Sequence, residues 1–476
     1  MYSSKMCSRV GKVAALLLRG LAASPTCDHI IVRDVAVIGG GAAGAHAAVW
    51  LRDHNQSVVV VEKASQLGGQ TAFYRDPATN KTINVGVQAW MEYKYTFDFP
   101  KRMNVSTNGS MEFTTLEYEY VDFRTGRPVP DFAAPGPDAL YPALQRYLDV
   151  ILQYEDMVLP GFSNFPAPGS IPEDLLMPFG EFAEKHDISA AVPQIWDSTG
   201  QGLGDTMNVP TLFVIQASGV PMVRALLGAA AAAVPPSGRL FELYERIAEF
   251  LGDDVLYSST VISATRSDEG VSLLVSDADR VQTCIEAKRL LIAFEPTAEN
   301  MSPFGPDETE KGVLDEFEYT TVYAGILRHP SLQLGKAYSN RLPESTNYTV
   351  FPTAAQVGRI DYIGGTHDLF QFTAVGTEDD TSESIKVLIA ESVDKMIAAG
   401  IIPATNGELT FPAFANHGKM HPRVSASVLR DGFIQKQLAL QGHRSTWYTG
   451  AAFSAGFTTV LWEYNNVVLP EMIGNL

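Results

Sequence analysis

A short apolar segment that runs directly into a glycine-rich turn constrains the fold of this chain more than any other feature. Residues 34–38 (DVAVI) are followed by Gly39, Gly41, Ala43 and Gly44 within the run GGGAAG. A strand, a tight turn and a helix in this order are the context of a dinucleotide-binding site. The first glycine permits the turn, the second lets the backbone approach a pyrophosphate, and the third lets the helix pack on the sheet. The segment predicts an α/β fold of the Rossmann type, with a helix N-terminus facing the phosphates.

An acidic residue at the end of the next apolar segment supports this interpretation. Residues 57–61 (SVVVV) lead into Glu62 and Lys63, and Glu62 lies 18 residues after Gly44. The ribose-binding acid of such folds lies about 20 residues beyond the turn. A carboxylate accepts hydrogen bonds from a ribose 2′-hydroxyl and repels a 2′-phosphate, so NADP is disfavoured. Glycine-rich turns also occur for purely structural reasons, but the two strands and the acid together predict a bound dinucleotide.

Two further segments favour FAD over NAD. Gly68, Gly69 and Gln70 follow the Glu62 strand, where a second glycine pair lets the backbone pass the cofactor again. Near the C-terminus, Gly450 and Ala451 interrupt a strand-like run, and a helix is expected over residues 458–469. The N-terminus of that helix could stabilise negative charge on a flavin. No second GxGxxG lies between a strand and a helix and no CxxC occurs, which argues against disulfide reductases and against reduction by a nicotinamide.

The segments at residues 39–44, 62, 68–69 and 448–452 resemble the flavin-containing amine oxidase superfamily, and within it the fungal β-cyclopiazonate dehydrogenase-like flavoproteins. The resemblance implies a discontinuous FAD-binding domain with an inserted α+β substrate domain, and a backbone contact from Val261 to the adenine. The implied domain boundaries are 31–98, 235–300 and 405–476 for FAD, and 99–234 and 301–404 for the substrate. Gln70 stands where amine oxidases usually carry arginine, so one phosphate contact is missing. No cysteine follows Cys284, so we expect noncovalent FAD.

The remaining elements follow from hydrophobic periodicity and from breaker residues. We expect short antiparallel strands within 104–129, helices over 140–151 and 240–251, and strands at 255–265, 271–275 and 290–294. Residues 160–178 are rich in Pro, Gly and Phe and predict either a lid or a plain connector. A second sheet is expected from strands at 317–327, 348–351 and 360–363, with a helix over 384–399.

Candidate catalytic residues are few. His417 lies in a predicted loop just before the C-terminal flavin segment, and it could accept a proton as hydride leaves a substrate. His421 is less favoured, and either histidine could bind nothing. Trp90, Trp447 and Phe453 flank the flavin segments and predict either an aromatic wall for the substrate or ordinary core. No Ser/His/Asp set, paired carboxylates or metal-ligand cluster stands out, so no metal is expected.

Charge and cysteine content exclude several classes of protein. With 35 Lys and Arg against 54 Asp and Glu, the formal net charge of −19 opposes binding to nucleic acid. The three cysteines, Cys7, Cys27 and Cys284, form no zinc motif and predict no disulfide scaffold. No apolar run reaches the roughly 20 residues that span a bilayer.

The first 30 residues predict either a signal peptide or a disordered extension. Basic residues precede the apolar run 13–18, but Arg19 shortens that run below the usual length. Six N-x-S/T sequons favour a glycoprotein of the secretory pathway over a cytoplasmic protein: Asn55, Asn80, Asn104, Asn108, Asn300 and Asn347.

Three functions compete. The first is an FAD-dependent oxidase or dehydrogenase that takes a hydride from a hydrophobic secondary metabolite and passes electrons to O2 or another acceptor. The resemblance implies that this oxidation could close a ring in the substrate. The second is a flavin-dependent double-bond isomerase of a polyunsaturated fatty acid. The third is a flavoprotein without turnover. We favour the first, because the cofactor carries the hydride chemistry and no catalytic base is obligatory.

Overall fold

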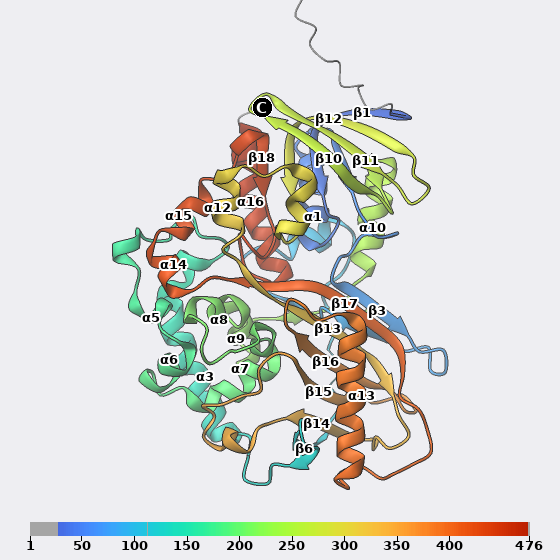
Figure 1. Cartoon of the computed structure of the whole chain (residues 1–476), viewed down its shortest axis with the longest axis vertical. Helices are drawn as coiled ribbons and strands as arrows, with labels where there is room; N and C mark the ends of the chain where they lie inside the picture. Colours follow the sequence, from blue (N-terminus) through green and yellow to red (C-terminus); the bar gives the residue numbers. More distant parts are fainter. Residues whose placement is uncertain (1–26, 112, 475–476) are drawn as a thin grey trace, which may run out of the picture.

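The computed structural model describes residues 27–111 and 113–474, so most of the expected leader, including Cys7, lies outside the described residues. Two seven-stranded sheets organise the chain, one in the upper and one in the lower half of Figure 1. The long strand β17 (Thr410–Arg423) crosses between the two halves.

The first sheet contains the predicted dinucleotide-binding strand. Its strands run in the order β10-β11-β12-β1-β2-β9, and β18 also pairs with β12. Their bounds are β1 His29–Ile38, β2 Val58–Val61, β9 Val255–Leu256, β10 Thr260–Ser267, β11 Gly270–Ser276, β12 Gln282–Ile292 and β18 Thr446–Tyr448. The apolar end of β1 is parallel to both β12 and β2 and is fully buried, as parallel sheets covered by helices require. Because β1 begins at His29, the end of the expected leader belongs to the sheet.

Helix α1 (Ala42–Asp53) packs against both α10 (Glu242–Leu251) and α16 (Thr458–Gly474) beside this sheet. The helix expected over 458–469 is therefore present and longer than predicted. The strand expected over 255–265 is divided into β9 and β10 by a turn with Ser258 in the left-handed region.

The second sheet is mostly antiparallel, in the order β17-β13-β16-β15-β14-β6-β7. Its other strands are β6 Glu117–Asp122, β7 Arg127–Pro128, β13 Glu318–Arg328, β14 Lys336–Asn340, β15 Gln356–Tyr362 and β16 Phe370–Gly376. Helix α13 (Ser382–Ala398) covers it and buries Ile385, Ile389, Val393 and Met396. Two expectations are corrected. Residues 348–351 form no strand, and β17 pairs with β13, so residues 410–423 belong to the second sheet and not to the FAD region.

A layer of short helices lies beside the second sheet (Figure 1). It contains α3 Pro137–Ile151, α4 Glu155–Val158, α5 Glu173–Leu176, α6 Phe179–Lys185, α7 Val192–Ser198, α8 Thr211–Ala217 and α9 Val220–Leu226. The segment 160–178 is thus partly helical. The short helix α2 (Asp98–Arg102) lies instead against α1 and α16, where Phe99 contacts His46 and Trp462. The remaining helices are α11 Ala298–Met301, α12 Glu308–Leu314, α14 Ala426–Arg430 and α15 Phe433–Leu438. Two separate strand pairs complete the fold: β3 (Thr71–Arg75) pairs with β4 (Thr82–Gly86), and β5 (Trp90–Met91) pairs with β8 (Ala232–Ala233).

Cys27 and Cys284 form a disulfide that the cysteine spacing did not predict. It joins Cys27, two residues before the start of β1, to the neighbouring strand β12, in which Thr283 pairs with His29. Within the described part of the chain, no helix is both long enough and apolar enough to cross a membrane.

Candidate functional site

A cavity of about 840 Å³ opens at the carboxyl ends of the central parallel strands. Ligands of open α/β sheets bind at this edge. The strand ends of β1, β2, β12 and β18 form one wall, and β17 of the second sheet forms another. Nearly all the predicted cofactor residues line it: Gly39, Gly41, Ala43, Glu62, Lys63, Gly68, Gly69, Gln70, Val261, Gly450 and Ala451.

The glycines have separable structural roles. Gly41 caps α1 with extended backbone (φ −75°, ψ −166°), and a Cβ placed there would lie 3.6 Å from the Gly69 Cα, an ordinary contact. Nothing in the protein therefore demands glycine at 41, whereas a dinucleotide approaching the backbone does. Gly44 does not line the cavity, and a Cβ there would lie 1.9 Å from the Gly39 carbonyl oxygen. Gly44 thus allows α1 to pack closely on the turn.

Glu62 is a buried carboxylate at the cavity wall. Its Oε2 accepts a hydrogen bond from the Gly40 N–H at 2.6 Å, and its Oε1 accepts one from the Ala64 N–H at 2.7 Å. Two backbone donors fix the orientation of the carboxylate, and each oxygen has a further lone pair for a ribose hydroxyl. The residues present fit the adenosine end of FAD.

The opposite end of the cavity is formed by the segment after β18. Gly450 adopts φ +110°, and nothing lies within 4 Å of the position of its missing Cβ. Thr458, at the start of α16, also lines the cavity, so the positive end of that helix is directed at it. Asn465 of α16 accepts a hydrogen bond from the Thr449 hydroxyl at 2.7 Å and donates one to the Ala43 carbonyl at 2.7 Å. This fully buried amide links the two cofactor-binding helices.

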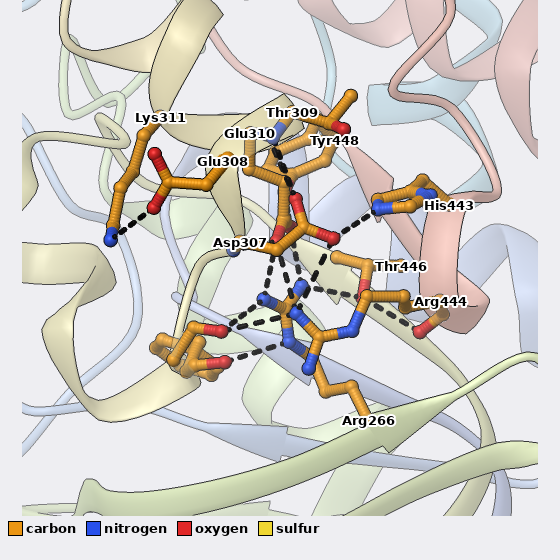
Figure 2. A network of polar contacts seen from close by, with 12 residues as sticks. Arg266, Asp307, Glu308, Thr309, Glu310, Lys311, His443, Arg444, Thr446 and Tyr448 are labelled. Atoms are coloured by element: carbon orange, nitrogen blue, oxygen red, sulfur yellow. Dashed lines mark hydrogen bonds and ion pairs between the residues drawn. The ribbon is translucent and has the colours of Figure 1, made fainter.

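A buried polar network holds β18 in place (Figure 2). Arg266 and Glu310 form a two-point ion pair, with Nη1–Oε1 and Nη2–Oε2 distances of 2.6 and 2.8 Å, and both side chains are fully buried. Glu310 also accepts a hydrogen bond from the Tyr448 hydroxyl at 2.7 Å, and Arg266 donates one to the Thr446 hydroxyl at 3.0 Å. Asp307, Glu310 and His443 lie close enough together to share a cation, but Arg266 and Arg444 already neutralise these carboxylates.

The wall from the second sheet carries both candidate histidines. They lie in strand β17, and not in the expected loop, because β17 pairs with β13. Both line the cavity, and burial lowers the pKa of each to about 4, for His421 with a smaller contribution from Arg423. The Nε2 of His417 is shielded from solvent and has no hydrogen-bond partner within the protein. His417 is therefore a neutral imidazole with a free ring nitrogen.

The three predicted aromatic residues do not line the cavity. Trp90 is fully buried, with its ring 5.8 Å from that of Trp462. Phe453 stacks on Tyr448 at 4.9 Å, and Trp447 is buried in β18. Their rings belong to the core, which was the alternative considered for them.

Apolar side chains far from the recognised segments line the cavity instead. They come from different elements and carry no recognisable motif: Val87, Leu203, Phe213, Ala217, Met420 and Leu461. Sequence reasoning missed them, and it also missed Glu295, because only the tertiary fold brings them together.

Comparisons with known proteins agree with this site. Residues 37–102 match the family model described as an NAD(P)-binding Rossmann-like domain. The chain is 31% identical over 460 residues to an FAD-dependent oxidoreductase of Monascus ruber, covering 94% of each chain. It is 33% identical to an FAD-dependent oxidoreductase of Colletotrichum higginsianum (92% and 93% covered) and 30% identical to the β-cyclopiazonate dehydrogenase of Aspergillus oryzae (93% of each).

Solved structures share the fold at low sequence identity. A fatty acid isomerase from P. acnes superposes with a TM-score of 0.68 at 16% identity, over 92% of this chain and 98% of its own. Cyclohexylamine oxidase from Brevibacterium oxydans superposes with a TM-score of 0.61 at 18% identity, over 93% and 99%. The fold is that of the flavin amine oxidases, the cofactor is FAD, and the chain belongs to the family of FAD-dependent oxidoreductases that includes β-cyclopiazonate dehydrogenase.

Proposed function

We propose that this FAD-dependent oxidoreductase oxidises a hydrophobic secondary metabolite, with His417 accepting the proton released from the substrate. The observation that carries the proposal is the neutral imidazole of His417, which lines the same cavity as Leu203 and Phe213 and whose Nε2 has no hydrogen-bond partner within the protein. When bound, FAD supplies the two-electron acceptor. The apolar side chains exclude water from the substrate, and His417 Nε2 has a free lone pair for the proton.

The substrate class is tested by anaerobic mixing of the FAD-loaded protein with a panel of hydrophobic fungal metabolites. β-Cyclopiazonate is the first probe, because a dehydrogenase named for it is 30% identical to this chain. An oxidised product, with ring closure as one form, together with loss of the flavin absorbance supports the proposal. A rearranged product with no lasting loss of absorbance would show an isomerase, and no reaction with any metabolite would leave a flavoprotein without turnover.

The role of His417 is tested by its pH dependence. Because burial lowers the pKa of His417 to about 4, the free base is present above that pH, and the rate of flavin reduction should be flat between pH 5 and 8 and fall below pH 5. His417→Gln should bind FAD normally, slow the reduction by about 100-fold or more and lose the acidic limb. His367→Gln removes an exposed histidine as the control. An acidic limb that persists in His417→Gln belongs to another group.

The electron acceptor is proposed to be O2 or another small oxidant. No nicotinamide-binding motif accompanies the FAD site in the sequence. Reoxidation in air that yields one hydrogen peroxide per substrate would identify an oxidase. Slow reaction with O2 and fast reaction with a dye acceptor would identify a dehydrogenase.

We also propose that the chain passes through the secretory pathway. The Cys27–Cys284 disulfide favours an oxidising compartment. Four of the six sequon asparagines lie exposed in turns or loops, and a fifth, Asn347, is exposed at the end of a 3-10 helix. Asn300 differs, because its amide donates to the Glu295 carbonyl at 2.9 Å and it lines the cavity. Peptide mapping of protein from a fungal host should find glycans at some of Asn55, Asn80, Asn104, Asn108 and Asn347 but not at Asn300. An unglycosylated, intracellular product would contradict the proposal.

A further inference from the structure

Glu295 is a half-buried residue at the cavity wall that neither the motifs nor the proposed chemistry uses. It lies three residues beyond the end of β12, and its Oε2 is shielded from solvent without a hydrogen-bond partner. Its backbone carbonyl is held by the Thr297 N–H at 2.8 Å and the Asn300 amide at 2.9 Å. The side chain is therefore placed by an ordered turn, but the carboxyl group is left unsatisfied by the protein.

The position of Glu295 is set by the strands on either side of β12. The Ala293 N–H donates to the Ile38 carbonyl at the end of β1, and the Thr449 N–H donates to the Ile292 carbonyl from the end of β18, both at 2.9 Å. One neighbour leads into the Gly39–Gly41 turn and the other into Gly450. Glu295 thus extends from the strand between the two segments that bind the cofactor.

The environment of Glu295 favours its neutral form. Burial raises the pKa of its carboxyl group to about 8, and no ion pair reaches it from the described residues. From β13, Tyr319 faces the same region, and its pKa is raised, chiefly by burial, so that it stays a neutral hydroxyl. Burial is the only cause of this shift, so the other titratable groups lining the cavity do not offset it: Lys419 is paired with Glu378, His417 and His421 are neutral, and Glu62, Lys63 and Glu299 make no contribution.

We propose that Glu295 is a neutral carboxylic acid that donates a hydrogen bond to bound FAD. A protonated carboxyl satisfies its buried oxygen by donating a proton, whereas a carboxylate would set a negative charge beside a diphosphate. The inference concerns the cofactor alone and stands whether or not the proposed substrate class is correct. Glu62 provides the contrast, because both of its carboxyl oxygens already accept hydrogen bonds from backbone N–H groups.

The first test is the dissociation constant of FAD measured with apoprotein between pH 6 and 9.5. If the protonated form binds, raising the pH by one unit above a pKa of about 8 should weaken wild-type binding about tenfold, in proportion to the protonated fraction. Glu295→Gln keeps a donor of the same shape and should bind FAD within about threefold of wild type at pH 7, without that loss at pH 9. Glu295→Leu removes the donor and should weaken binding about fivefold or more at pH 7. An equal pH slope in wild type and Glu295→Gln, or full affinity in Glu295→Leu, would overturn the proposal.

The second test uses the thermal midpoint of the apoprotein and separates protonation from cofactor contact. The folded pKa of Glu295 is raised above its unfolded value, so the wild type loses stability relative to Glu295→Gln as the pH rises from about 4.5 to about 8. The variant should therefore melt higher than wild type at pH 8 and near it at pH 4.5. Glu316→Gln, on an exposed surface, is the control and should shift neither value. A difference that does not change with pH would contradict a raised pKa.

Discussion

The substitutions Gly41→Ala and Gly44→Ala separate binding of FAD from stability of the fold. A Cβ at Gly41 meets only the Gly69 Cα, at 3.6 Å, and the backbone of Gly41 is one that alanine adopts freely. The unfolding free energy of Gly41→Ala apoprotein should therefore stay within about 0.5 kcal/mol of wild type. The added methyl group occupies space that the pyrophosphate needs, and overpacking of this kind costs about 1–3 kcal/mol. We expect FAD to bind about 5- to 150-fold more weakly.

Gly44→Ala should show the opposite pattern. Its Cβ would lie 1.9 Å from the Gly39 carbonyl oxygen, so α1 must move away from the turn. We expect the apoprotein to lose about 1–3 kcal/mol of unfolding free energy. The assays are guanidinium unfolding without FAD and titration of apoprotein with FAD. Gly169→Ala, at an exposed position with no atom within 4 Å of the added Cβ, is the control. Wild-type FAD affinity in Gly41→Ala would refute the placement of the pyrophosphate.

Three further substitutions test other parts of the site. Glu62→Ala should weaken FAD binding by about 1–3 kcal/mol in the same titration, because the Gly40 and Ala64 donors lose their acceptor; unchanged affinity would show that Glu62 does not hold the ribose. Glu310→Gln leaves the charge of Arg266 buried without its partner. The unfolding free energy measured in guanidinium should therefore fall by about 3–5 kcal/mol. A loss below about 1 kcal/mol would show that other groups compensate the charge of Arg266. Thr458→Glu places a negative charge at the start of α16. The reduction potential of the flavin, measured by dye equilibration, should therefore fall. An unchanged potential would mean that the helix does not face the flavin.

The cofactor half of the site could be predicted because its determinants are local. The turn after β1, the acid after β2 and the glycine after β18 each follow a strand within a few residues. The strand β17 could not, because Gly418 and Pro422 are typical of a loop and its pairing with β13 is distant in sequence and irregular. The Cys27–Cys284 bond was hidden for the same reason, since 257 residues separate the two cysteines.

Proximity in sequence also misled the assignment of aromatic residues. Trp447 and Phe453 flank Gly450, but the side chains of β18 are all buried and the ring of Phe453 stacks within the core. Glu295 showed no motif, because its significance depends on the two strands that flank β12. Which side chains face the cavity is decided by tertiary packing, which hydrophobic periodicity does not encode.

The central claim, that this cavity binds FAD noncovalently, is tested most directly by the flavin released from the purified protein. Heat or acid denaturation followed by chromatography should yield intact FAD in the supernatant, at close to one FAD per chain. We expect FAD because the glycine turn and Glu62 bind its adenosine end. We expect its release because no cysteine follows Cys284 to bind it covalently. Flavin that remains on the precipitated polypeptide would show a covalent bond. Release of FMN alone, or of no flavin after reconstitution with FAD, would contradict the account.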